Sequence, residues 1–370
     1  MKELRIAIID PVGKKAGLDH YDLSLALALN RQFCFVKVYS NFSDDNNSSI
    51  VFEKFDVNFT KPFILLVKLF PAFYSSLKNA KTDKTEIIIL HIFHSTFIDW
   101  LMIFLTRRFG FKICLIVHDA ESFIYKKRKS WINKCMLLSD NVVIHNKFTY
   151  DALYKRSNVD NQNKLSVIPH GNFINLHKQL ERDDALIVFN LDKSFKYILF
   201  FGMIKKSKGL EIVIEAMKQV SENVHLIIAG RIRDADFSEY ISLADKINVT
   251  NRLHIMNRYI SNEERNTLLN ISDTVILPYH SAWQSGVMIM AMSYGIPVIA
   301  SDLKPNKEVI ENGKNGFLFS SGNPSELAEK INFVTSDNEM RDKVGKTGLQ
   351  YIKVNNDWDK IGEKFINLFK

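Results

Sequence analysis

The segment 277–302 constrains the fold more than any other part of the chain, because it places a helix between two buried strands. The apolar strand 274–277 ends at Pro278, which has no N–H to donate to a sheet. Apolar residues at helical spacing follow, and Gly295 ends the helix. The run 297–300 is then the next buried strand. The helix therefore begins in a loop that follows one strand and precedes another.

The start of this helix is a candidate anion site. Ser285 is a favourable N-cap, Gly286 lets a ligand approach the backbone, and Val287 begins the apolar face. The first N–H groups of a helix have no intrahelical partner and carry a partial positive charge, so a phosphate fits there. The same residues also occur where they only cap a helix, and the pattern alone leaves both interpretations open.

Strands and helices alternate in the first half of the chain, which predicts a parallel sheet with helices on both faces. Ligands bind such sheets at the carboxyl ends of the strands. Several polar residues there favour a ligand site, although each alone is equally typical of a hydrogen-bonded structural residue. The strands are expected at 4–9, 34–39, 87–93, 112–117 and 141–145, the helices at 18–32 and 97–109, and the polar residues are His91, His94, His118, Asp119 and His145.

A second α/β unit begins near residue 195. The strand 198–201 ends at Gly202, and the loop MIKKSKG leads into a helix at 210–220. Lys208, with Lys205 beside it, lies where an ammonium group can join helix N–H groups at a phosphate. A solvated loop is the alternative for these lysines.

The length of 370 residues predicts two domains. We expect an acceptor-binding Rossmann-like domain at 1–175, a donor-binding Rossmann-like domain at 176–355, and a last helix, 356–370, that packs back on the first domain. The fold class is α/β, with two Rossmann-like domains that face a central cleft.

Composition excludes several classes of protein. A hydrophobic content of 46% and a charged content of 24% are typical of globular proteins, and no run of 18 apolar residues predicts a transmembrane helix. The net charge of +8 without an Arg-rich block favours acidic ligands or an anionic membrane over nucleic acid. The cysteines Cys34, Cys114 and Cys135 lack metal-ligand spacing, so we expect reduced thiols and a cytoplasmic protein.

Apolar segments with basic flanks raise the question of membrane contact. They are 63–77, interrupted by Lys68 and Pro71, and 97–105, which precedes Arg107 and Arg108; the basic run 126–129 adds to them. Such segments suit peripheral binding to the inner face of the cytoplasmic membrane. Packing of both apolar stripes into the core is the alternative.

Motifs in several segments, taken in order, resemble those of glycosyltransferase family 4, the retaining group 1 glycosyltransferases of the GT-B fold. The resemblance extends over nearly the whole chain and is densest after residue 195. The segments are AGLDHYDLSLALAL, IVHDAE, FFGMIKKSKGLEIVIEAM, LIIAG and LPYHSAWQSGVMIMAMSYGIPVIASDLKPNKEVIENGKNGFLF.

The resemblance implies roles for particular residues. Gly17 would let the first domain's backbone approach the donor diphosphate, and His118 would contact the transferred sugar. Lys208, assisted by Lys205, would neutralise the diphosphate, and His118 and Lys208 are the expected catalytic residues. Ser285, Gly286 and Val287 would bind the diphosphate through the helix N-terminus, and candidates for nucleotide or sugar contacts are Gly202, Gly230, Gln284 and Glu308.

The reaction implied is transfer of a hexosyl group from a nucleotide sugar, with retention, to a glycan or a polyprenyl-diphosphate-linked acceptor. No cofactor is expected. No metal is expected either, although Asp234 and Asp236 match a short metal-binding pattern of a different glycosyltransferase fold.

The chain departs from the family at three positions. Met203 replaces an arginine, for which Lys205 is the candidate substitute, and Ala282 and Met290 replace a pair of glutamates. These departures keep open a catalytically silent homologue that binds a nucleotide sugar or a partner glycosyltransferase. A dinucleotide enzyme is disfavoured, because neither half has a GxGxxG turn.

Overall fold

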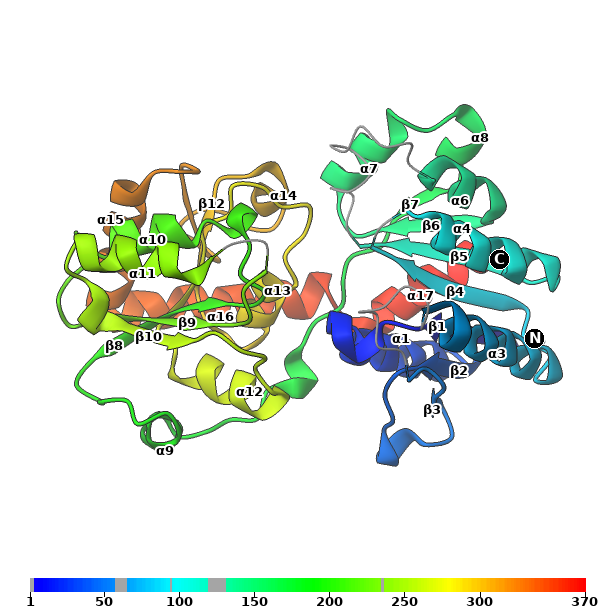
Figure 1. Cartoon of the computed structure of the whole chain (residues 1–370), viewed down its shortest axis with the longest axis horizontal. Coiled ribbons are helices and arrows are strands. Elements are labelled where there is room, and N and C mark those ends of the chain that lie inside the picture. The colour runs from blue at the N-terminus through cyan, green and yellow to red at the C-terminus, as the bar shows by residue number, and fades with distance from the viewer. Residues whose placement is uncertain (1–2, 57–64, 94, 119–130, 234–235) are drawn as a thin grey trace. The chain divides into compact units, whose positions relative to one another are not determined.

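The computed structural model describes residues 3–56, 65–93, 95–118, 131–233 and 236–370. The chain divides into two compact units, each built on its own sheet (Figure 1). The first unit comprises Met1–Gly171 together with Asn356–Lys370, and the second comprises Asn172–Asn355. The last helix is therefore part of the first unit.

The first unit contains a seven-stranded parallel sheet in the order β3-β2-β1-β4-β5-β6-β7. Its strands are apolar runs buried under helices on both faces, which confirms the predicted α/β class. The strands are β1 (Arg5–Asp10), β2 (Phe35–Ser40), β3 (Val51–Glu53), β4 (Ile87–Ile92), β5 (Lys112–Val117), β6 (Asn141–Ile144) and β7 (Leu165–Val167). The helices are α1 (Asp19–Arg31), α3 (Phe70–Thr82), α4 (Phe97–Arg108), α6 (Ile132–Leu138), α7 (Lys147–Tyr154), α8 (Val159–Gln162) and α17 (Trp358–Phe369).

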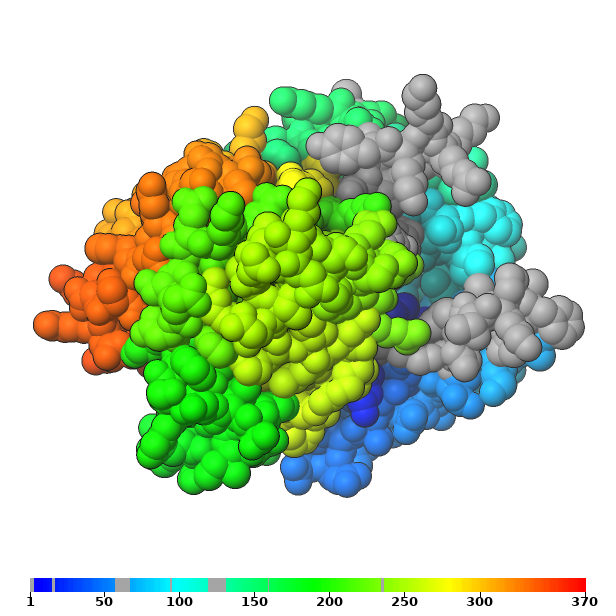
Figure 2. All heavy atoms as spheres, turned by 60° about the vertical axis from the view of Figure 1, so that its left-hand side comes forward, coloured from blue at the N-terminus to red at the C-terminus, as the bar shows by residue number. Residues whose placement is uncertain are grey.

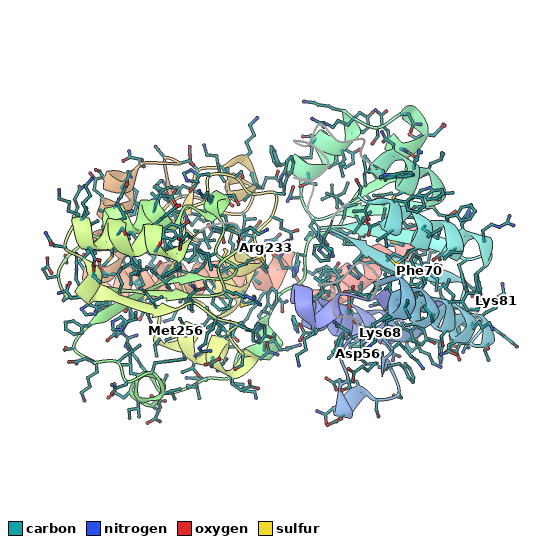
Figure 3. The ribbon with its side chains drawn as sticks, in the orientation of Figure 1. Asp56, Lys68, Phe70, Lys81, Arg233 and Met256 are labelled. Atoms are coloured by element: carbon teal, nitrogen blue, oxygen red, sulfur yellow. The ribbon has the colours of Figure 1, made fainter. Side chains whose placement is uncertain are left out.

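The apolar segment 63–77 is helical over its described residues. Leu65–Leu69 forms a π-helical turn, and α3 then begins with Pro71 in its first turn. Proline is tolerated there because the first N–H groups of a helix have no intrahelical partner. Lys68 pairs with Asp56 at 3.1 Å, while Lys81 lies near the other end of α3 (Figure 3). Residues 63 and 64 lie outside the described residues.

Helix α17 completes the core of the first unit. Trp358, Ile361 and Phe365 are buried in the same apolar cluster as Leu25 and Leu29 of α1. The backbone of Gly362 approaches Ala28 so closely that an added Cβ would lie 3.1 Å from the Ala28 carbonyl oxygen. The C-terminal helix is thus a structural part of the sheet that begins at the N-terminus.

The second unit contains a six-stranded parallel sheet in the order β10-β9-β8-β11-β12-β13. Alternate residues of β8 enter separate cores, Tyr197 and Leu199 on one face and Ile198 and Phe200 on the other. In Figure 2 the yellow-green surface that includes α11 forms an outer face of this unit. The strands are β8 (Lys196–Phe201), β9 (Val224–Ala229), β10 (Leu253–Met256), β11 (Thr274–Leu277), β12 (Val298–Ser301) and β13 (Phe317–Phe319). The helices are α9 (Arg182–Val188), α10 (Leu210–Ala216), α11 (Phe237–Lys246), α12 (Asn262–Ile271), α13 (Gly286–Ser293), α14 (Lys304–Lys307), α15 (Pro324–Ser336) and α16 (Asn338–Asn355).

Candidate functional site

The N-terminus of α13 is capped as its sequence predicts. Ser285 is the buried N-cap residue, and its Oγ accepts the N–H of Met288 at 3.2 Å. The N–H groups of Gly286 and Val287 belong to the first turn, where no intrahelical acceptor exists. A Cβ added to Gly286 would meet nothing within 4 Å, so the space beside this backbone is open. The capping interpretation is therefore confirmed, while anion binding by the first-turn N–H groups stays a prediction that this geometry allows.

The lysine loop before α10 is fixed to the segment that leads into α13. Lys206–Lys208 form one turn of 3-10 helix, and Gly209 follows with φ 63°. A Cβ on Gly209 would lie 2.0 Å from the carbonyl oxygen of Pro278, so only glycine fits. The N–H of His280 donates to the carbonyl of Ser207 at 3.0 Å, and its Nε2 lies 2.5 Å from Glu211.

Lys208 lies over an aromatic ring at this junction. Its Nζ is 3.6 Å from the ring centroid of Tyr279, which is buried between Pro278 and the loop toward α13. A cation held on a ring face keeps most of its charge available to an anion, because the ring contributes no formal negative charge. Lys208 and the α13 segment thus come from one rigid part of the second unit.

Two glycines allow the strand ends beside this junction to approach each other closely. Gly230 has φ 147°, and a Cβ there would lie 1.9 Å from the carbonyl oxygen of Gly202. Gly202 itself has φ 106°, and its added Cβ would lie 3.6 Å from Cγ2 of Val287. These two candidates therefore place the ends of β8 and β9 against each other and against the first turn of α13.

The other candidates of the second unit are dispersed. Gln284 is half-buried directly before the N-cap, whereas Glu308 is exposed after α14 and its carbonyl accepts the Tyr351 hydroxyl at 3.5 Å. Lys205 is half-buried and precedes the lysine turn. Met290 is buried in the apolar core of this unit, and Ala282 packs against the same core. The two positions where the family has glutamates are thus apolar here.

One aspartate of the short metal-binding pattern lies within the described residues. Asp236 is the N-cap of α11, and its Oδ1 accepts the N–H of Ser238 at 3.0 Å. Asp234 lies outside the described residues. The one described member of the pattern is thus engaged in a helix cap.

A cluster of rings forms at the carboxyl edge of the first sheet. The ring of Tyr21 on α1 lies 5.0–5.6 Å, centroid to centroid, from four imidazoles and from Trp358. The imidazoles are those of His91, His118, His145 and His170. His91 Nδ1 and His118 Nε2 are 2.7 Å apart, and His118 is half-buried. His94 and Asp119, also expected on this rim, lie outside the described residues.

Sequence reasoning missed the acidic members of this edge. Asp10 ends β1 and is buried, and Asp22 on α1 is fully buried with Oδ1 at 3.0 Å from His91 Nε2. The helical periodicity of α1 could have indicated that Asp22 is buried, because it places Tyr21 and Asp22 on the face that also carries Leu25 and Leu29.

Burial controls protonation at this edge. Burial, together with the neighbouring imidazoles, lowers the pKa of His118 well below its usual value. Burial also lowers the pKa of His145 to about 3 and the pKa of His170 to about 4. The three imidazoles are therefore neutral near pH 7 and suited to hydrogen bonds with uncharged hydroxyls. Burial also raises the pKa of Asp22 to about 7, although His91 acts in the opposite direction.

Gly17 lies beside the first turn of α1. It has φ 73°, closes the turn Gly13–Ala16, and is exposed, so an added Cβ would meet nothing within 4 Å. The backbone at this position is therefore accessible to a ligand.

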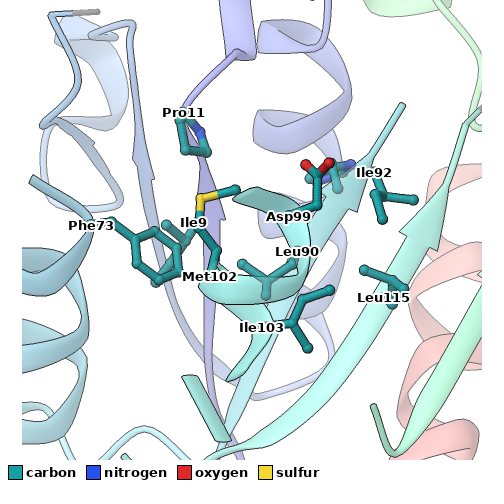
Figure 4. A pocket seen from close by; sticks show the side chains of 10 residues that line it. Ile9, Pro11, Phe73, Leu90, Ile92, Asp99, Met102, Ile103 and Leu115 are labelled. Atoms are coloured by element: carbon teal, nitrogen blue, oxygen red, sulfur yellow. The ribbon is translucent and has the colours of Figure 1, made fainter. Parts of the chain in front are cut away.

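A small cavity lies on the α3 and α4 side of the first sheet (Figure 4). It has a volume of about 20 Å³ and is lined mainly by apolar side chains, with Asp99 and His91 among the lining residues. That volume suits a single water molecule and is far too small for a sugar. The cavity is therefore not the substrate site.

Replacing His145 by glutamine should make the first unit less sensitive to acid. His145 Nδ1 donates to the carbonyl of Ile168 at 2.9 Å, and the folded state keeps the ring neutral, whereas the unfolded chain takes up a proton below its ordinary pKa. The parent's stability therefore falls as the pH falls. When the pH is lowered from about 7.5 to about 5, the parent should lose about 2 kcal/mol more unfolding free energy than the His145→Gln variant.

Urea unfolding at both pH values measures this shift. His177, which is exposed, provides the matched control as His177→Gln. An equal shift in both variants would contradict a buried neutral His145.

Comparison with known proteins gives a family match in the second unit. Residues 181–351 match the family described as glycosyl transferases group 1. The spore coat protein SA of Bacillus subtilis is 28% identical over 185 residues, which cover 47% of this chain and 48% of that protein. The capsular polysaccharide biosynthesis glycosyltransferase CapM of Staphylococcus aureus is 25% identical over 207 residues, or 53% of each chain. The aligned region thus spans about half the length of these relatives.

Solved structures match over the whole chain. Anabaena HepE in complex with UDP and glucose superposes with a TM-score of 0.78 and 18% identity, covering 99% of both chains. A glycosyltransferase from Rickettsia africae has a TM-score of 0.77 at 17% identity, covering 100% of this chain and 98% of that one. These likenesses confirm the GT-B fold. Within the described residues no helix is long and apolar enough to cross a membrane.

Proposed function

We propose that this chain, whose residues 181–351 belong to the group 1 glycosyl transferases, is a retaining glycosyltransferase of bacterial surface polysaccharide synthesis. It transfers a hexosyl group from a nucleotide-diphosphate sugar to a glycan or lipid-linked glycan. The observation that carries the proposal is the contact of the Lys208 loop with the segment that leads into α13, which places an ammonium group and first-turn helix N–H groups in the same unit. Both favour a diphosphate.

In this proposal the main catalytic role of the site is to stabilise the diphosphate leaving group. The bond from the anomeric carbon to the donor diphosphate breaks, and the acceptor oxygen bonds to the same face of that carbon. The negative charge that develops on the diphosphate is met by Lys208 and by the N–H groups of Gly286 and Val287. The departing phosphate accepts the acceptor's proton, so no protein base is required. His118, which is neutral, offers a hydrogen bond to a sugar hydroxyl.

The position of the missing arginine has a neighbouring cation. Met203 is partly exposed, and Arg233 Nη1 lies 4.0 Å from its sulfur. The loop after β9 thus supplies a guanidinium beside the place where the family has an arginine after β8. This favours activity despite the substitution.

A catalytically silent homologue is the second candidate, because Ala282 and Met290 bring no carboxylate to the donor segment. A screen of nucleotide sugars by thermal shift, followed by turnover with the best ligand and assignment of the product's anomeric configuration, separates the two. We expect a ligand to raise the melting temperature and to be turned over with retention. Binding without turnover would favour the silent homologue, and inversion would exclude the retaining mechanism.

Transfer should persist in excess EDTA. Lys208 and helix N–H groups meet the diphosphate charge in this proposal, so no Mg²⁺ or Mn²⁺ is needed there. The measurement is initial rate with and without EDTA, followed by addition of either ion. A rate that disappears in EDTA and returns with Mg²⁺ or Mn²⁺ would contradict this expectation.

The acceptor proposal rests on the outer face of α4. Phe97 and Phe104 are exposed, and Trp100 stacks between them with Trp131 nearby. Lys134 lies 4.2 Å from the ring of Trp131. Aromatic rings beside cations suit an anionic lipid surface, from which a polyprenyl-diphosphate-linked acceptor is available. The basic run 126–129 lies outside the described residues.

Vesicle flotation tests this face. The protein should bind anionic vesicles at low salt and be released at high salt, since each basic residue near the surface contributes only about 1 kcal/mol. The double variant Phe97→Ser/Phe104→Ser should bind less, whereas Tyr259→Ser, at an exposed tyrosine of the second unit, should bind as the parent does. Absence of binding at low salt would favour an acceptor free in solution.

A further inference from the structure

The acidic edge of the first sheet contains buried polar atoms whose hydrogen-bonding capacity is not used. Asp10 Oδ2, both carboxylate oxygens of Asp22, and His91 Nε2 have no hydrogen-bond partner in the described structure. Asp10 is 1% exposed, Asp22 is fully buried, and the His91 side chain is 1% exposed. One ligand atom from each of these residues lies within 4.8 Å of the others.

Two buried carboxylates and one imidazole meet at this edge. Buried charges are costly unless they are paired or coordinate a metal. No ion pair between Asp10 or Asp22 and a lysine or arginine occurs among the described residues, and His91 is the one basic group whose ion pair with Asp22 is found there. His91 Nε2 and Asp22 Oδ1 are 3.0 Å apart and form an ion pair when the imidazole is protonated. A divalent cation shared by these residues would balance the charge of both carboxylates.

We propose that Asp10, Asp22 and His91 bind a divalent transition-metal ion, with Zn²⁺ as the expected occupant, in a site that supports the first unit. Carboxylate oxygen and imidazole nitrogen are ordinary ligands of Zn²⁺, at about 2.0–2.2 Å, and ligand atoms around such an ion are therefore about 3–4 Å apart. An imidazole ligand disfavours Ca²⁺ and Mg²⁺, which bind oxygen atoms.

The second nitrogen of His91 is placed as in established metal sites. A metal-bound histidine normally donates its other ring N–H to a neighbouring acceptor, which fixes its orientation. His91 Nδ1 is 2.7 Å from His118 Nε2. With Nε2 on the metal, Nδ1 carries the proton and donates it to His118, whose own proton is then on Nδ1.

This site is separate from the chemistry proposed for the donor diphosphate. Its ligands come from β1, α1 and β4 of the first unit, and none of them is among the residues assigned to the diphosphate. The site therefore stands or falls independently of the glycosyltransferase proposal, and its test does not use turnover.

The test is metal content of the full-length protein. The parent is incubated with ZnCl₂, desalted and analysed by mass spectrometry of the metal, and a parallel sample with Co²⁺ is examined for the visible absorption of a coordinated ion. We expect about one Zn²⁺ per chain and a raised melting temperature. Asp22→Asn and Asp10→Asn keep the shape of each side chain but remove a charged ligand, and each should reduce retained zinc at least tenfold. Two ligand variants are used so that failure of one to fold leaves the other informative.

Matched controls exclude adventitious binding. Asp19→Asn changes a carboxylate of the same helix outside the cluster, and His177→Ala removes an exposed histidine; both should retain zinc as the parent does. Zinc retained equally by the ligand variants, or a parent that retains none and shows no change in melting temperature, would overturn the proposal. If the parent retains no zinc, a proton shared between Asp10 and Asp22 reduces the negative charge there instead.

Discussion

Replacing Trp358 by alanine should destabilise the first unit by about 3–5 kcal/mol, the usual range for deleting a large buried aromatic side chain. Trp358 is 4% exposed, and its ring packs at 5.2 Å from that of Tyr21 at the carboxyl edge of the sheet. The deletion therefore leaves a cavity beneath the histidine cluster. Hydrogen exchange of the amides of β1 and β4 measures the loss in the first unit alone, which matters because a two-unit chain need not unfold in one step.

Phe97→Ala is the control for this deletion, because Phe97 is 50% exposed and its loss should cost far less than that of Trp358. An equal cost for the two substitutions would contradict the buried position of Trp358 and the assignment of α17 to the first unit.

The position of Trp358 also explains why residue 171 is a glycine. A Cβ at this position would lie 2.1 Å from Cε2 of Trp358, so Gly171→Ala should cost about 1–3 kcal/mol in the parent. In the Trp358→Ala background the clash is absent, and the same substitution should cost almost nothing. The double-mutant cycle therefore predicts a large coupling energy between the two positions. Additive costs would show that Gly171 is required for another reason.

Replacing Lys208 by alanine should weaken binding of a nucleoside diphosphate by about 1.5–3 kcal/mol, or roughly ten- to a hundredfold. The ammonium group lies over Tyr279 at the junction with the α13 segment, where it adds a full charge to the partial charge of the helix N-terminus. Calorimetry with UDP and other nucleoside diphosphates measures the loss.

Lys206→Ala is the matched control for Lys208→Ala. Lys206 belongs to the same turn but is exposed and faces Glu239 at 3.8 Å, so its removal should change affinity little. Unchanged affinity in Lys208→Ala, with the fold intact, would remove Lys208 from the diphosphate site.

The local structure of the candidate donor segment was largely predictable, because its determinants are local. Ser285 caps α13, Gly209 precedes α10 and Gly230 follows β9, and each assignment needs only a few neighbouring residues. Glycine and N-cap preferences act through the backbone of a single turn, so sequence spacing reports them directly. The order of strands and helices follows from the same kind of local pattern.

The sequence by itself determined the alternation of elements, the two parallel sheets and the serine cap at the start of α13. Only the tertiary structure decided that Asp10, Asp22 and His91 meet at one edge and that Gly171 must accommodate Trp358. These contacts join residues far apart in the chain, and their distances depend on sheet order and helix packing. A periodic pattern shows that a side chain is buried, whereas the fold decides which other buried groups it meets.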